Sequence, residues 1–289
     1  MAMRQITIFL AATVLAGCQN QAVDNASNSA TTETPAPSGA NAELSLTRLD
    51  CGHADFKDMN GFFSDRPGVY PPGPGKVADS CYLIRHGDDL MLWDTGLPAA
   101  TKDKPMVQGG MTGAIDRTIA EQLEQLGVKP ADIDVVGISH VHADHTGQAK
   151  DFPQARLVIG KADFDYTADK NDPFTAWRGS GKQVTAEDAD IDVFGDGEVV
   201  ALFLPGHTNG HHALLVKLKS GDVLLTGDLY HTEIARQKRA KPSWNDNAEQ
   251  TLASMDKFEA MAKKLNAKVI IQHEPADISK LPAFPDAAK

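Results

Sequence analysis

The chain has 289 residues, enough for one large domain or two small ones, and 42% of them are hydrophobic, which is ordinary for a globular protein with a sizeable core. Its formal net charge at pH 7 is −11, and it contains no block rich in lysine and arginine. Because nucleic-acid-binding proteins usually present a basic stripe, this composition argues against a nucleic-acid partner.

The first residues have the pattern of an export signal. Arg4 gives a short positive start, and residues 6–15 form an apolar run of signal-peptide length that is too short to span a bilayer permanently. The sequence Leu-Ala-Gly-Cys at residues 15–18 resembles a bacterial lipobox. It predicts that residues 1–17 are a cleaved signal peptide and that the sulfur of Cys18 carries lipid, with a plain secretory leader as the alternative.

Residues 18–42 are predicted to be a lipidated, disordered tether. The stretch from 19 to 41 is rich in Ala, Ser, Asn, Thr and Pro and has almost no large apolar residue, so it cannot bury enough surface to fold. Gln19 stands where an aspartate would indicate retention in the inner membrane, which favours an outer-membrane anchor facing the periplasm. The remaining residues, 43–289, are expected to form a single folded domain.

Cys51 and Cys81 are the two cysteines of that domain. In an oxidising compartment an even pair indicates a disulfide, and two buried thiols are the alternative that the sequence leaves open. Neither cysteine lies in a Cys-x-x-Cys pair, so metal ligation by cysteine is disfavoured.

Short apolar runs bounded by Gly, Asp or Pro predict strands. Segments 81–84 and 90–93 flank a Gly-Asp-Asp turn and predict a hairpin. Further buried strands are predicted at segments 133–138, 157–159, 199–204, 213–216, 223–225 and 269–271. Apolar residues at helical spacing predict helices over 115–126 and 252–265. Strands interspersed with helices indicate an α/β protein whose sheets are covered by helices.

Three histidines and an aspartate lie within six residues, directly after the predicted strand that ends at Ile138. They are the polar members of the segment His140-Val141-His142-Ala143-Asp144-His145. A surface patch gains nothing from such a group, and in a core each polar atom would need its own partner. Imidazole nitrogen and carboxylate oxygen are ligands that suit zinc, manganese, iron or cobalt. The segment therefore predicts a metal site.

Three more candidate ligands also follow predicted strands. His207 lies in Pro-Gly-His-Thr-Asn-Gly-His, Asp228 in Thr-Gly-Asp, and His273 directly after the last predicted strand. Alone, each has an ordinary interpretation as a loop, core or turn residue. Histidines and carboxylates at the ends of four different strands indicate one convergent site.

Taken together and in this order, these segments resemble the metallo-β-lactamase superfamily from Leu44 to the C-terminus. The resemblance implies an αββα sandwich with the site along one edge of the two sheets. It also implies two divalent metal ions, with zinc the first expectation, and Asp94 as an aspartate that supports the site from behind. The implied ligands are His140, His142 and His207 on one metal, Asp144, His145 and His273 on the other, and Asp228 bridging both.

Within the superfamily, the chain most resembles the N-acyl-homoserine lactone lactonases. Class B β-lactamases lack the bridging aspartate, and the glutathione-binding C-terminal segment of glyoxalase II is not recognisable here. The resemblance implies a quorum-quenching hydrolase in which a hydroxide shared by the metals attacks the lactone carbonyl. Asp144 would pass a proton to the leaving alkoxide, and Asp228 would hold the metals together.

The position three residues after the bridging aspartate departs from the family pattern. Well-known lactonases have a tyrosine there, whereas this chain has His231, with Tyr230 one residue earlier. Either side chain could assist by hydrogen bonding to the carbonyl or leaving oxygen. The same segment also resembles the methyl parathion hydrolase group, so the alternative function is hydrolysis of organophosphate triesters or of esters and lactones in general.

The expected partner is a small lactone whose acyl chain requires an apolar trough. Phe62, Phe63, Phe174 and Trp177 are candidates for its walls, with core packing as the alternative. Two other classes are weighed against the lactonase, an iron-dependent redox relative and a non-catalytic metal-binding lipoprotein, and the open two-ion site disfavours the second. A homodimer and a monomer are both left open.

Overall fold

Two sheets make up the centre of the computed structural model, which describes residues 43–168 and 172–289. The signal peptide, Cys18 and the tether expected from the sequence lie outside the described residues. Within the described ranges, no helix combines the length and apolarity needed to cross a membrane.

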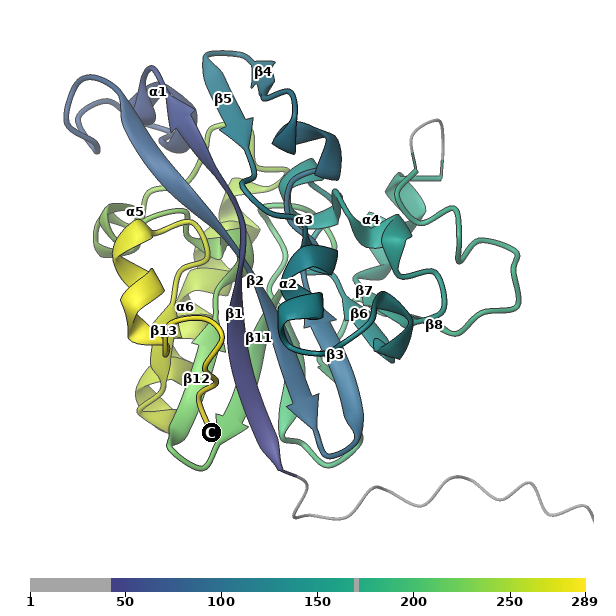
Figure 1. The fold of residues 1–289 in the computed structure, drawn as a ribbon. Coiled ribbons are helices and arrows are strands. Elements are labelled where there is room, and N and C mark those ends of the chain that lie inside the picture. The colour runs from purple at the N-terminus through teal and green to yellow at the C-terminus, as the bar shows by residue number, and fades with distance from the viewer. Residues whose placement is uncertain (1–42, 169–171) are drawn as a thin grey trace, which may run out of the picture. The chain divides into compact units, whose positions relative to one another are not determined.

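The first sheet has eight strands and the second has five (Figure 1). Across the first sheet the order is β4 (Met106–Gln108), β5 (Met111–Ala114), β1 (Leu44–Phe56), β2 (Gly75–His86), β3 (Asp89–Trp93), β6 (Val135–Gly137), β7 (Arg156–Ile159) and β8 (Val184–Ala186). Across the second sheet it is β13 (Lys268–Ile270), β12 (Gly221–Leu225), β11 (His212–Leu218), β10 (Val199–Phe203) and β9 (Ile191–Asp192).

The strands are connected by α-helices and short 3-10 helices. The α-helices are α1 (Met59–Phe63), α2 (Ile119–Gln125), α3 (Ala143–Thr146), α4 (Lys161–Tyr166), α5 (Glu233–Lys238) and α6 (Ala248–Leu265). The 3-10 helices are η1 (Ala99–Lys102), η2 (Pro130–Asp132), η3 (Ala149–Asp151), η4 (Gly227–Leu229) and η5 (Pro275–Lys280). Helix α2 starts later than the predicted 115 because Thr118 and Glu121 form a reciprocal capping box.

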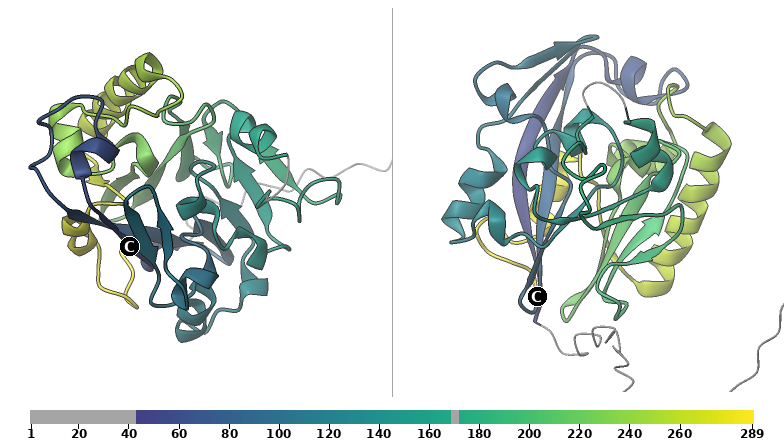
Figure 2. Two further views of the ribbon diagram at one scale, coloured as in Figure 1. Left: turned by 90° about the horizontal axis from the view of Figure 1, so that it is seen from above. Right: turned by 90° about the vertical axis from the view of Figure 1, so that its right-hand side faces the viewer.

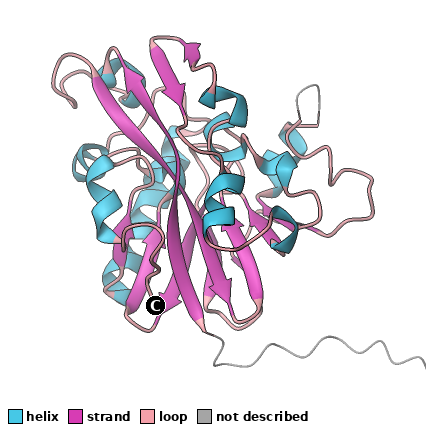
Figure 3. Cartoon of the chain, in the orientation of Figure 1, coloured by secondary structure: helices cyan, strands magenta, loops and turns pink. Residues whose placement is uncertain are grey.

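The layers follow from which face each side chain takes. On β2, Tyr82 and Ile84 join the apolar cluster between the two sheets, whereas Cys81 and Leu83 join a cluster on the outer face. Burial on both faces explains the continuous apolar runs in the sequence. Helix α2 covers the outer face of the first sheet and α6 covers that of the second (Figures 2 and 3). The expected αββα sandwich is confirmed.

The longest strand, β1, is absent from the strands predicted from apolar runs. Its buried and partly exposed residues alternate along most of its length, so it contains no such run. It pairs with β2, and a disulfide joins Cys51 of β1 to Cys81 of β2. The sequence left that pairing open, and the structure shows it formed.

Candidate metal centre

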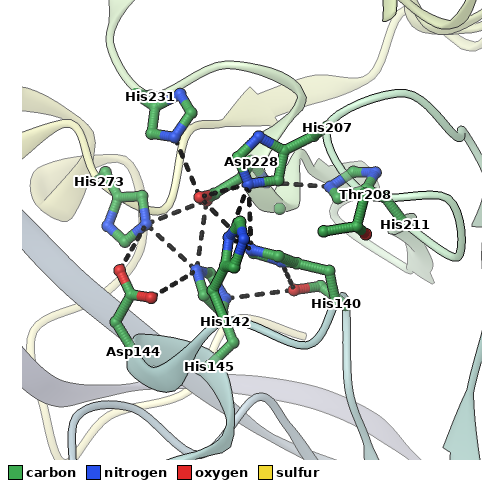
Figure 4. A network of polar contacts seen from close by, with 12 residues as sticks. His140, His142, Asp144, His145, His207, Thr208, His211, Asp228, His231 and His273 are labelled. Atoms are coloured by element: carbon green, nitrogen blue, oxygen red, sulfur yellow. Dashed lines mark hydrogen bonds and ion pairs between the residues drawn. The ribbon is translucent and has the colours of Figure 1, made fainter. Parts of the chain in front are cut away.

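The seven predicted ligands lie on segments that leave the two sheets at one edge. Strands β10, β12 and β13 run in the same direction, so their C-terminal ends meet there, opposite the turn that follows β6. The structure brings all seven side chains together, as Figure 4 shows. They are His140, His142, Asp144 and His145 after β6, His207 after β10, Asp228 in η4 and His273 after β13.

Three imidazoles form the first ligand group, defined as His140, His142 and His207. Nε2 of His140 lies 2.9 Å from Nδ1 of His142 and 3.2 Å from Nε2 of His207. Nε2 of His207 lies 3.0 Å from Nδ1 of His142. Three nitrogens from two separate segments therefore face one point.

The second ligand group is Asp144, His145 and His273. The two Nε2 atoms of its histidines lie 3.2 Å apart. The carboxylate oxygens of Asp144 lie 4.0 Å from Nε2 of His145 and 3.8 Å from Nε2 of His273. The Asp144 side chain is 37% exposed while both imidazoles are buried, so this group is open to solvent on its carboxylate side.

Asp228 lies between the two groups and is buried. Its Oδ1 lies 3.0 Å from Nε2 of His273 and 3.3 Å from Nε2 of His145. Its Oδ2 lies 3.3 Å from Nε2 of His207 and 3.6 Å from Nε2 of His140. One carboxylate oxygen therefore faces each group, which is the arrangement a bridging ligand requires.

The outer nitrogens of three of these imidazoles are fixed by acceptors. Nδ1 of His145 donates to Asp94 at 2.9 Å, and Nδ1 of His207 donates to Asn245 at 3.1 Å. Nδ1 of His273 donates to the carbonyl of Ala78 at 2.8 Å. Because these partners accept, the inner nitrogen of each ring carries the lone pair when that ring is neutral. Converging lone pairs and carboxylates repel one another unless cations lie between them. The donor set therefore fits two divalent metal ions.

Asp94 supports the second group and the turn before the first. Its backbone is left-handed, with φ 61°, and its Oδ1 accepts from the Ser139 N–H at 2.6 Å. Its Oδ2 accepts from His145 and also from Nε2 of Gln272 at 2.8 Å. Gln272 precedes His273, so one buried carboxylate positions both histidines of the second group. The supporting role predicted for Asp94 is confirmed by these contacts.

Without metal, the histidines of the two ligand groups differ in how readily they take up a proton. Burial lowers the pKa of His140 well below its usual value and that of His142 to about 4. Burial is also the largest single effect on His145 and His273 and acts in the same direction, but the neighbouring carboxylates together outweigh it. Asp228 and Asp144 raise the pKa of His273 to about 9, and these two with Asp94 raise the pKa of His145 well above normal. A cation in the second group would replace protons that the same carboxylate attracts.

The structure separates the two assisting candidates, Tyr230 and His231. Tyr230 is 1% exposed and packs beside Phe258 in the apolar cluster beneath α6. Nε2 of His231 lies 3.0 Å from Oδ2 of Asp228, and its ring stacks beside that of His273. Of the two, His231 is the residue placed at the candidate metal centre.

A pocket of about 470 Å³ opens onto the centre. At its base lie His142, Asp144, Asp228, His231 and His273. Its apolar walls include Phe62, Phe63, Leu97, Met106, Met111 and Trp244. The expectation is correct for the two phenylalanines and wrong for Phe174 and Trp177, which are buried in the cluster under the first sheet.

Three residues of the site are missing from the sequence prediction. Asn245 accepts from His207, Trp244 lines the pocket, and Asp163 hydrogen-bonds to the turns that carry His140, His142 and His207. Each lies in a polar segment with no metal-binding motif. Only the folded chain brings them to the centre.

The family follows from a match to known sequences. The sequence profile described as the metallo-beta-lactamase superfamily matches residues 74–273. The chain belongs to this superfamily. The matched region contains Asp94 and all seven candidate ligands.

Two curated relatives are both named N-acyl homoserine lactonase AttM. The N-acyl homoserine lactonase AttM of Rhizobium johnstonii is 30% identical over 227 residues, which cover 71% of this chain and 85% of the relative. The AttM protein of Agrobacterium fabrum is 32% identical over 186 residues, which cover 58% of this chain and 70% of the relative.

Solved structures share the fold. A quorum-quenching N-acyl homoserine lactone hydrolase superposes with a TM-score of 0.72 and 21% identity, covering 86% of this chain and 98% of that chain. A second structure superposes with a TM-score of 0.71 and holds N-hexanoyl-L-homoserine at its catalytic metal centre. At this identity the likeness shows the αββα fold alone.

Proposed function

We propose that this superfamily member is a quorum-quenching lactonase that hydrolyses N-acyl-homoserine lactones. The observation that carries the proposal is an apolar pocket opening directly onto a ligand set for two metal ions. The names of the two relatives and the product bound in the second solved structure support the same substrate class.

The pocket matches the shape and polarity of such a substrate. An acyl-homoserine lactone has a small polar ring joined through an amide to an apolar chain. The ring would lie at the base near Asp144 and His231, and the chain would extend along Phe62, Met106 and Met111. Burying a chain against these side chains gains about 0.8 kcal/mol for each CH₂ group removed from water.

The chain's own residues would orient the lactone and move the proton. When bound at this centre, two divalent ions polarise a carbonyl oxygen and lower the pKa of a water molecule, which is the chemistry lactone hydrolysis needs. Asp144 faces the pocket, and its carboxylate can take a proton from the attacking water and give it to the alkoxide as the ring C–O bond breaks. His231 can donate a hydrogen bond to a substrate oxygen from the same base.

The decisive experiment is a substrate panel on protein of measured zinc content. We expect kcat/KM above roughly 10⁴ M⁻¹s⁻¹ for a long-chain acyl-homoserine lactone, and far lower values for an aryl phosphotriester and a thioester. Ring opening no faster than the buffer background would reject the lactonase proposal.

A phosphotriester hydrolase is the second candidate. It is favoured by His231 at the position where well-known lactonases have tyrosine, because no phenol then faces the pocket from that position. The same panel decides between the two: faster turnover of the phosphotriester than of every lactone would select this candidate.

We also propose that the protein is exported and anchored to the outer membrane through lipid on Cys18, with residues 18–42 as the tether. The lipobox-like motif at residues 15–18 supports lipidation. The Cys51–Cys81 disulfide supports an oxidising compartment such as the periplasm, because cytosolic thiols are kept reduced.

A further inference from the structure

Asp163 has a buried carboxylate that takes no part in the proposed hydrolysis. It lies in α4 and is 2% exposed. Among the described residues, no lysine or arginine pairs with it, so its charge must be stabilised by hydrogen bonds. All three of its donors belong to two other segments, and those two segments carry the first ligand group.

The contacts join the two turns that carry His140, His142 and His207. Oδ2 of Asp163 accepts from the Val141 N–H at 3.1 Å and from the Thr208 hydroxyl at 2.7 Å. Its Oδ1 accepts from the Gly210 N–H at 2.8 Å. Val141 is the residue between His140 and His142, and Thr208 follows His207 directly.

The start of α4 is pressed against the same turn. A Cβ atom on Gly160 would lie 1.9 Å from the carbonyl oxygen of Gly210, so only glycine allows this approach. Three residues after Gly160 the chain reaches Asp163, whose carboxylate contacts both turns. Backbone proximity and hydrogen bonding therefore act together on the first group.

Asp94 makes the corresponding contacts on the other side, to His145 and to the side chain beside His273. We propose that Asp163 is a positioning residue that holds the first ligand group, and not the second, in its metal-binding geometry. The inference rests on the candidate metal centre but not on the identity of the substrate.

The test compares zinc binding by Asp163→Asn with that by the wild-type protein. An asparagine keeps the volume but presents an NH₂ group to at least one of the three donors. We expect zinc to bind the first group 10–100-fold more weakly, as for other residues that orient metal ligands, with the second group unchanged. The readout is a titration of metal-free protein with zinc against a competing chelator.

X-ray absorption on protein carrying one zinc equivalent then identifies which group remains. Asp163→Asn should retain the site with two imidazoles, and Asp94→Asn the site with three. Asp134→Asn is the control for loss of a hydrogen-bonded carboxylate elsewhere, because Asp134 is exposed and accepts from the Leu90 N–H at 2.8 Å at the end of β3 away from the centre. It should bind both zinc ions as the wild type does.

Unchanged zinc affinity, or equal weakening of both sites, would overturn the inference. If Asp163→Asn does not fold, Thr208→Val removes only the 2.7 Å bond and keeps the test decisive: weaker zinc binding at the three-histidine site supports the inference and unchanged binding overturns it. A wild-type protein that binds two zinc ions but opens no lactone would reject the proposed function and leave this inference standing.

Discussion

The ligand cluster and the pocket that opens onto it are held by different forces. In the cluster, the outer nitrogens of His145, His207 and His273 are each fixed by an acceptor 2.8 to 3.1 Å away. In the pocket, the Phe62 ring lies 4.6 Å from that of Phe56 and 5.7 Å from that of Trp244. Directional bonds fix the cluster, whereas apolar packing shapes most of the pocket wall.

This difference predicts how each region responds to change. Removing a charged ligand leaves the remaining buried groups without their partner, which costs several kcal/mol. Trimming a wall residue removes apolar contact in proportion to its area and leaves the rest in place. Substitutions in the cluster should therefore abolish chemistry, and those in the pocket should alter substrate preference.

Asp228→Ala should have the largest effect. Among the residues that the structure describes, it removes the only carboxylate that faces both ligand groups. We therefore expect loss of at least one metal ion and a fall in kcat of about 10³-fold or more. Elemental analysis and lactone kinetics measure the two quantities. Asp134→Ala is the control, and full turnover by Asp228→Ala with a single metal would contradict a dinuclear mechanism.

His231→Ala should come next, with a loss of about 10²-fold in kcat. Its side chain reaches the pocket base, whereas Tyr230 packs under α6. Tyr230→Phe keeps that packing and should leave kcat within about twofold of the wild type. Steady-state kinetics on one lactone measures both variants. A larger loss of kcat in Tyr230→Phe than in His231→Ala would assign the assisting role to the tyrosine.

Trp244→Ala should cost about tenfold in kcat/KM for a long-chain lactone and much less for a short one. The indole lines the pocket, and its N–H donates to the Phe62 carbonyl at 2.9 Å, so its removal also loosens the neighbouring wall residue Phe62. Ile278→Ala is the control, because Ile278 is 39% exposed against 41% for Trp244 and does not line the pocket. Equal losses on both substrates would show that the indole supports the metal centre and does not bind the acyl chain of the substrate.

The ligand cluster and the pocket also differ in how far the sequence could predict them. The ligands lie in short motifs after apolar strands, and the αββα fold followed from their resemblance to a known superfamily. Asp163 and Asn245 contribute single polar side chains from ordinary helix and loop segments, so no local pattern distinguishes them.

The pocket walls and the adjacent pair Tyr230 and His231 could not be resolved either. Phe62 and Phe174 are both aromatic residues in loop-like sequence, yet one lines the pocket and the other lies in the core. Which of two neighbours faces the site depends on the turn after Asp228, where Tyr230 has extended backbone angles (φ −138°, ψ 132°). Such choices are made by packing between distant segments.

Cys18→Ser should have the smallest effect on catalysis and a complete effect on location. If residues 18–42 form the tether predicted from their composition, a segment of that length separates its ends by roughly 25–30 Å, which keeps the lipid away from the centre. We therefore expect kcat/KM to stay within about twofold of the wild type while the protein moves from the membrane fraction to the soluble periplasmic fraction. Membrane association that survives the substitution would reject lipidation of Cys18. A changed kcat/KM in the released protein would mean that the membrane surface contributes to the pocket. The hydrogen bonds within the ligand cluster would then not be enough to fix the catalytic geometry.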